Sequence, residues 1–218
     1  MKRKITLIVL CLLSVAISVS AQEMRKYEIG ADVSYGISLA KSNSNHIGVN
    51  VFGGYKPTEH ITIGAGINYS YFQNRLLPYD NEFVFIQTEP YHSFRPYVYG
   101  RYDFLPSCKW IPFVGARVGY GFFSKSTFIF GVLPPSGSMY GEDDLSAYEY
   151  LKDLDHTLGV KGGVFCAMNF GISRKIGQKG SRITLGASLE IQPMTFKYVD
   201  KSEYRTGITI GPNIGFSF

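Results

Sequence analysis

The sequence predicts an all-β fold in which eight antiparallel strands close into an up-and-down barrel. Two observations lead to this fold class: apolar residues recur at every second position over eight separate runs, and no long run has the 3.6-residue period of an amphipathic helix. The composition agrees, because 45% hydrophobic and only 18% charged residues exclude an intrinsically disordered chain. A length of 218 residues allows one domain with at most a short appendage.

The first 21 residues have the features of a cleavable export signal. Basic residues at positions 2–4 precede an apolar run at 5–18, and small residues at 19–21 fit a signal-peptidase site. We therefore expect residues 22–218 to form the mature domain. Removing these three from the 22 Lys and Arg leaves 19 against 17 Asp and Glu. The resulting net charge of about +2 gives nucleic-acid binding no support.

Apolar residues mark one face of each predicted strand. The first four strands cover 27–39, 46–55, 61–72 and 92–104, and their apolar faces include Tyr27, Ile29, Val33, Ile47, Val49, Val51, Ile61, Ile63, Ile67, Phe94, Val98 and Tyr102. The last four cover 110–122, 157–173, 181–195 and 204–218, and their apolar faces include Trp110, Val114, Val118, Leu158, Val160, Met168, Ile183, Leu185, Leu189, Ile208, Ile210 and Ile214. Each run is therefore a strand with two unlike faces.

The charged residues within these strands lie on the face opposite the apolar one. We expect them to form a polar network in the barrel lumen, and they are Glu28, Asp32, Arg95, Arg101, Asp103, Arg117, Lys161, Arg182, Glu190 and Arg205. Amides share that face, and they are Asn50, Asn68, Asn169, Gln192 and Asn213. Inward glycines such as Gly30 and Gly66 offer the space that arginine side chains would fill.

A soluble barrel with an apolar interior and a membrane barrel with an apolar exterior share this alternation. Most runs have ten or more residues, enough to cross a hydrocarbon core when tilted. Aromatic residues such as Tyr71, Trp110 and Phe122 lie near the ends of the apolar runs. Every second connection is short, whereas 73–91 and 123–156 are long. This pattern favours a transmembrane barrel with short periplasmic turns and long extracellular loops.

With these features, the chain resembles the small outer-membrane β-barrels of the OmpA/OmpX type. More closely, the phrases at 95–100 (RPYVYG) and 159–163 (GVKGG) are similar to outer-membrane barrel proteins of Bacteroidota, including PorT-like members. The resemblance implies a terminal signal for the barrel-assembly machinery, formed by Phe218, Phe216, Ile214 and Ile210. Pro212 lacks an N–H and puts a regular ladder in doubt at that point. The same residues also fit as ordinary lipid-facing side chains of the last strand.

The interior of an eight-stranded barrel is narrow enough for side chains to fill, so we expect a polar plug rather than a conducting pore. We expect no catalytic residues, cofactor or metal. The histidines His46, His60, His92 and His156 lie at strand ends or in turns and do not make a nucleophile–base pair. Cys108 and Cys166 could form a disulfide, but the predicted strands hold them apart.

The long loops carry their own signals. In 123–156, Phe128, Phe130 and Val132 continue the alternation of the fifth strand, which predicts that this strand extends beyond the membrane. Leu145–Leu154 predicts a short surface helix with a capping box at Ser146 and Glu149. The acids at 142–144 fit a solvated face or a calcium site.

The segment 83–86, in the other long loop, either lengthens a neighbouring strand or contacts a partner. The short turns are basic enough to attract anionic headgroups.

Taken together, these features predict a monomeric outer-membrane barrel, exported by its signal peptide, with a structural or interaction role in envelope integrity, adhesion or a secretion or assembly complex. The expected partners are outer-membrane lipid and lipopolysaccharide, the barrel-assembly machinery and envelope or secretion-complex proteins. A small pore or transporter for ions or small solutes, a lipid-A-modifying enzyme and a soluble ligand-binding barrel are the alternatives.

Overall fold

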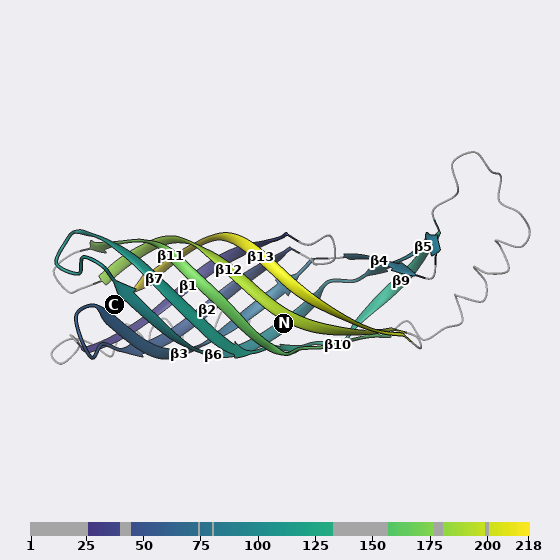
Figure 1. Ribbon diagram of the computed structural model, residues 1–218, viewed down its shortest axis with the longest axis horizontal. Coiled ribbons are helices and arrows are strands. Elements are labelled where there is room, and N and C mark those ends of the chain that lie inside the picture. The colour runs from purple at the N-terminus through teal and green to yellow at the C-terminus, as the bar shows by residue number, and fades with distance from the viewer. Residues whose placement is uncertain are drawn as a thin grey trace, which may run out of the picture.

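The computed structural model describes residues 26–39, 45–73, 75–79, 81–132, 157–176, 181–198 and 201–218. Of the thirteen strands in these residues, eight form a closed antiparallel barrel (Figure 1). They are β1 (Tyr27–Ser38), β2 (His46–Tyr55), β3 (Ile61–Phe72), β6 (Tyr91–Asp103), β7 (Trp110–Tyr120), β11 (Val164–Ile176), β12 (Ser181–Tyr198) and β13 (Lys201–Ser217). Pairing of β1 with β13 closes the ring. The predicted fold class is therefore confirmed.

Each barrel strand has an apolar face outside and an inner face that holds its charged and amide residues. Val49, Ile63 and Leu185 expose 46%, 52% and 53% of their surface, whereas Asn50 exposes 1%. Since successive side chains of a strand point to opposite faces, one register places the alternating apolar residues of a run on the outer wall. The outer surface of the barrel is therefore apolar. Some inward positions are also apolar, and the buried ones include Ile111, Phe113 and Phe165. In the described residues, no helix has the length and hydropathy needed to cross a bilayer.

The predicted strand 157–173 is interrupted at Gly162 and Gly163, which separate β10 (Thr157–Lys161) from β11. Leu158 and Val160 are buried before the break, whereas Phe165 and Ala167 are buried after it. Even-numbered residues therefore face inward before the glycines and outward after them. A substituent on Gly162 would collide with the Gly121 backbone, so the irregularity needs glycine there.

Four of the remaining strands continue the barrel wall as an extension at one end, on the right of Figure 1. They follow β12 in the order β10, β9 (Ser126–Val132), β5 (Asn81–Thr88) and β4 (Arg75–Tyr79). The fifth, β8 (Phe122–Phe123), pairs with β6 just past the end of β7. We call this the extension end, and we call the opposite end, with the connections 56–60 and 104–109, the turn end.

The extension changes several predicted connections. The segment 83–86 lies in β5, and residues 128–132 form part of β9, which pairs with β5 and β10. The ladder that joins β7 and β8 to β6 continues in the same register where β9 pairs with β5, so the predicted prolongation of the fifth strand beyond the barrel is confirmed. The predicted connection 196–203 is largely strand, because β12 and β13 stay paired up to Tyr198 and Lys201. The predicted signal peptide, the helix at 145–154 and the acids at 142–144 lie outside the described residues.

Candidate functional site: a closed polar lumen

The sequence analysis predicts that the charged residues of the strands form a network in the barrel lumen. The side chains of Glu28, Asp32, Arg95, Arg101, Asp103, Arg117, Arg182, Glu190 and Arg205 lie on the inward faces of their strands. Lys161 is the exception, since it is exposed on the outer side of β10. The prediction for Lys161 is wrong because the break at Gly162 and Gly163 exchanges the two faces. Alternation alone cannot show such an exchange.

At the extension end, the lumen contains an apolar aromatic layer. Phe72 stacks on Tyr91 with ring centroids 4.9 Å apart, and Phe123 lies 5.6 Å from Phe72. Phe196 is fully buried and meets Tyr91 edge-on at 6.4 Å. Leu158 is also fully buried. The sequence analysis missed this layer because it assigned Tyr91, Phe123 and Phe196 to connections.

Below the aromatic layer, Arg95 crosses the lumen. Its guanidinium donates to Asn68 Oδ1 at 2.7 Å and to Ser70 Oγ at 2.7 Å, both on β3. It also donates to Gln192 Oε1 at 3.0 Å and forms an ion pair with Glu190, both on β12. In the ring of eight strands, β3 and β12 are four places apart and so lie opposite each other. Arg95 therefore joins opposite walls while only 1% of it is exposed.

A row of hydrogen bonds connects Arg95 to the first strand. Asn68 Nδ2 donates to Asn50 Oδ1 at 3.0 Å, and Asn50 Nδ2 donates to Asp32 Oδ1 at 2.5 Å. The strand register explains this row, because Asp32 pairs with Asn50, Asn50 with Asn68 and Asn68 with Arg95. Buried amides and charges are thereby given the partners that burial requires.

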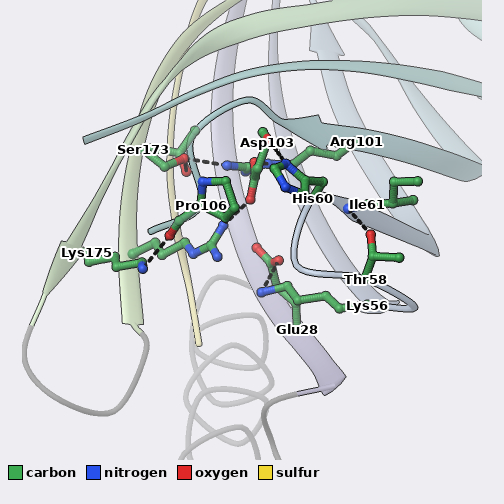
Figure 2. Close-up of polar contacts among 12 residues, drawn as sticks. Glu28, Lys56, Thr58, His60, Ile61, Arg101, Asp103, Pro106, Ser173 and Lys175 are labelled. Atoms are coloured by element: carbon green, nitrogen blue, oxygen red, sulfur yellow. Dashed lines mark hydrogen bonds and ion pairs between the residues drawn. The ribbon is translucent and has the colours of Figure 1, made fainter. Parts of the chain in front are cut away.

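At the turn end, a second ionic cluster closes the lumen (Figure 2). Asp103 accepts from Arg101 Nε at 2.7 Å and from Arg182 Nη1 at 2.5 Å. Arg101 Nη2 also donates to Ser173 Oγ at 2.6 Å, which ties β6 to β11. Closer to the turns, Lys56 pairs with Glu28 at 2.8 Å. One carboxylate thus bridges two guanidinium groups, and the cluster joins three strands.

Between the two ionic clusters lies a cavity of about 70 Å³. Its lining includes Asp32, Tyr97, Tyr99, Arg101 and Arg117. At about 10–15 Å³ of accessible volume per water molecule, the space suits about five waters and no larger organic ligand. Arg117 donates to Asn169 Oδ1 at 2.7 Å and lies 3.9 Å from Asp32. The Tyr99 hydroxyl is buried without a hydrogen-bond partner in the described protein, which suits a water-filled space.

Aromatic rings, and not arginines, occupy the space beside the glycines named above. A Cβ atom on Gly30 would lie 2.5 Å from Phe52 Cζ, and one on Gly66 would lie 2.6 Å from Tyr97 Cζ. Both distances are too short for real contacts, so these rings lie directly on the glycine backbone. The expectation that arginines fill this space is therefore wrong at these two positions.

The outer wall has an aromatic rim at each end. Trp110 and Tyr102 lie at the turn end, and Tyr120 and Phe94 lie toward the extension, each with 42–52% of its surface exposed. Trp110 and Tyr120 are ten residues apart on β7, which at ~3.3 Å per residue and a tilt of about 40° separates the rims by about 25 Å. Between them, the outward residues of β7 are Pro112, Val114, Ala116 and Val118. The band matches the apolar height of a transmembrane barrel.

The residues assigned to an assembly signal lie on the outer face of the last strand. Ile210, Ile214 and Phe216 are exposed, and the Phe216 and Phe218 rings are 5.1 Å apart. The ladder between β13 and β12 is continuous through Pro212. The ladder between β13 and β1 skips Pro212 and Gly211, so the predicted irregularity is confirmed on that side. This placement fits both interpretations of these residues.

Among the residues that the structure describes, the histidines and cysteines are dispersed. His92 is exposed and bonded through Nδ1 to the Tyr69 hydroxyl at 2.8 Å, whereas His46 is buried against Phe72. Cys108 and Cys166 are both free and exposed. In the described ranges, no three His, Cys, Asp or Glu side chains are grouped so that they could hold a metal ion.

Comparison with known proteins found similar solved structures. No family model and no curated protein matches the chain. Among solved structures, it is similar to Neisserial surface protein A (13% identity, 88% of this chain and 94% of that chain, TM-score 0.44). It is also similar to the N-terminal β-barrel domain of OprF from Pseudomonas aeruginosa (14%, 88% and 97%, TM-score 0.42) and to the outer membrane protein AlkL (10%, 92% and 93%, TM-score 0.43). Because these TM-scores are below 0.5, the fold assignment depends on the strand pairing observed in this chain and not on these neighbours.

Proposed function

We propose that this chain is an integral outer-membrane barrel without a through-pore, and that it acts as a structural or interaction protein whose functional surface is the extension. The observation that carries the proposal is the contrast between the two faces of the wall. An unbroken apolar band lies outside, and interlinked side chains fill the inside. A closed barrel satisfies every internal backbone group, which is the condition for spanning hydrocarbon.

The lumen argues against conduction. A solute would have to pass the aromatic layer, displace Arg95 from four partners and then part Asp103 from Arg101 and Arg182. Breaking a buried ion pair by removing one partner costs about 3–5 kcal/mol. The cavity of about 70 Å³ lies between these clusters. The barrel therefore serves as an anchor, and we assign it no catalytic role, cofactor or metal.

The expected partners follow from this location. The outer wall contacts outer-membrane lipid and lipopolysaccharide, the last strand engages the barrel-assembly machinery, and the extension meets envelope or secretion-complex proteins. The similarity of residues 95–100 and 159–163 to PorT-like proteins of Bacteroidota favours a secretion-related partner. The barrel itself is expected to be a monomer, because β1 and β13 pair with each other and no barrel strand is left as an edge.

Fractionation and electrophysiology test the anchor. The protein should sediment with outer membranes, require detergent for extraction and migrate differently on gels before and after boiling. Purified protein in planar bilayers should give no unitary conductance steps. Regular steps would contradict the closed lumen, and extraction without detergent would contradict the membrane location.

Photo-crosslinking in intact cells tests the interaction surface. Crosslinkers at the exposed Glu89 and Thr127, at the base of the extension, should capture protein. Matched positions Thr58 and Glu59, exposed in a turn at the opposite end, serve as controls. Equal capture from both pairs of positions, or capture from the turn alone, would overturn the assignment of the extension as the interaction surface.

A further inference from the structure

Basic side chains gather at the outer rim of the turn end. Arg174 and Lys109 are both exposed, and Lys109 directly precedes β7, whose first residue, Trp110, pairs with Arg174 of β11. The guanidinium carbon of Arg174 lies 5.1 Å from the centroid of the Trp110 ring. The backbone N–H of Lys175 donates to the carbonyl of Lys109 at 3.1 Å, which fixes the two strands together at this point.

These two cations differ from Lys56 and Lys175 at the same end. Lys56 is committed to Glu28, and Lys175 Nζ donates to the Pro106 carbonyl at 2.5 Å, as Figure 2 shows. For Arg174 and Lys109, no carboxylate partner exists among the residues that the structure describes. Their charges are therefore free to meet an anion from outside the protein.

The position of this pair relative to the apolar band restricts what that anion can be. Trp110 marks the turn-end rim of the band, and tryptophan rings favour the headgroup level of a bilayer. A guanidinium held over its ring lies at the depth of lipid phosphates, and arginine presents a planar fork that matches phosphate geometry. Long basic side chains at this depth place their charge in the headgroup layer.

We propose that Trp110, Arg174 and Lys109 form a binding site for the phosphate of an anionic phospholipid in the leaflet at the turn end. Arg174 and Lys109 bind the headgroup, and Trp110 positions the guanidinium and contacts the upper acyl chain. This inference rests on the membrane location proposed above and adds a lipid class to it.

The experiment uses the only tryptophan of the chain as the reporter. The mature protein is placed in vesicles that mix unbrominated phosphatidylcholine with brominated-chain phosphatidylglycerol or, in a parallel series, brominated phosphatidylcholine. Bromine quenches Trp110 fluorescence only from adjacent lipid. Because each basic group near an anionic surface favours anionic lipid about five-fold, phosphatidylglycerol should occupy the site at least about five-fold better than phosphatidylcholine.

Three variants test which residues cause the preference for phosphatidylglycerol. In R174Q/K109Q the ratio of quenching by the two brominated lipids should fall to near one, and R174K should retain most of it. Lys197→Gln, which removes an exposed lysine at the other end of the barrel, should leave the ratio unchanged. Comparing the two lipids within each variant cancels any change in the intrinsic brightness of Trp110.

The outcomes separate this inference from the one on which it rests. Equal quenching by both lipids in the unaltered protein, or a preference that survives in R174Q/K109Q, would overturn the phospholipid site and leave the membrane barrel standing. Absence of quenching by either lipid would overturn the membrane location itself.

Discussion

The two halves of the lumen are built from the same strands but are packed differently. Toward the extension, Arg95 makes hydrogen bonds or an ion pair with four side chains, and its guanidinium carbon lies 5.9 Å from the Phe72 ring centroid and 5.1 Å from that of Phe165. Toward the turns, Arg117 has one amide partner and a carboxylate at 3.9 Å, and it borders the cavity. The half toward the extension is thus filled by side chains, whereas the half toward the turns holds a cavity beside the Asp103 cluster, and we call it the hollow half.

This difference shows which interactions block the lumen. Alternation puts polar residues inside along the whole length, but a seal forms only where a charged group finds partners on opposite walls. Glu190 and Gln192 on β12 supply those partners for Arg95. In the hollow half, water can take the place of missing partners, because the space is polar and large enough to hold it. Substitutions in the two halves should therefore have unequal costs.

The largest effect is expected for Arg95→Ala. It leaves Glu190 as a buried charge without its guanidinium, and removing one partner of a buried pair costs about 3–5 kcal/mol of unfolding free energy. Urea unfolding in lipid vesicles, followed by the gel shift of the folded barrel, measures the loss. Glu190→Gln in the Arg95→Ala background should recover part of it, and a loss below 1 kcal/mol would contradict the seal.

Phe196→Ala should rank next. The ring is fully buried in the aromatic layer, and truncation of a buried Phe costs about 3 kcal/mol or slightly more. The same unfolding assay applies. Phe216→Ala, whose ring is 41% exposed on the outer wall, is the matched control and should cost clearly less in the same vesicles. Equal losses would mean that the inner layer is loosely packed.

Arg117→Ala should cost only about 1 kcal/mol. Its neighbours Asn169 and Asp32 border the cavity, so water can replace the lost guanidinium. Comparison with Arg95→Ala under identical conditions gives the intended contrast between the two halves. An effect as large as that of Arg95→Ala would show that the cavity does not admit water.

Tyr99→Phe should change the unfolding free energy least, by less than about 0.5 kcal/mol. The hydroxyl has no protein partner in the described structure and faces a space that can hold water, so its removal breaks no protein hydrogen bond. A Tyr97→Phe variant, made in parallel at the same cavity, provides the comparison. A loss of 2 kcal/mol or more from Tyr99→Phe, on the scale of a buried polar network, would reveal an ordered water held by that hydroxyl.

The period of two was enough to predict the eight barrel strands and the orientation of their faces, because a slip of one residue would expose every charge to the outside. It could not predict Lys161, whose face depends on a two-glycine irregularity, or the aromatic layer, which uses residues outside the regular runs. The sequence also could not predict that Arg95 pairs with Glu190. Alternation identifies the inward face of a strand but carries no information about which strand lies opposite.

The hairpin of β12 and β13 remains paired from Arg182 and Ser217 at the turn end to Tyr198 and Lys201 at the extension end. Because β10 joins the outer part of β12, whatever attaches to the extension is connected to the bilayer through backbone hydrogen bonds and not through a flexible tether. A pull on the attached object would load these bonds in shear, many at once, which is how a thin sheet withstands mechanical force. Under the function proposed above, this hairpin would transmit such a force from the extension to the barrel.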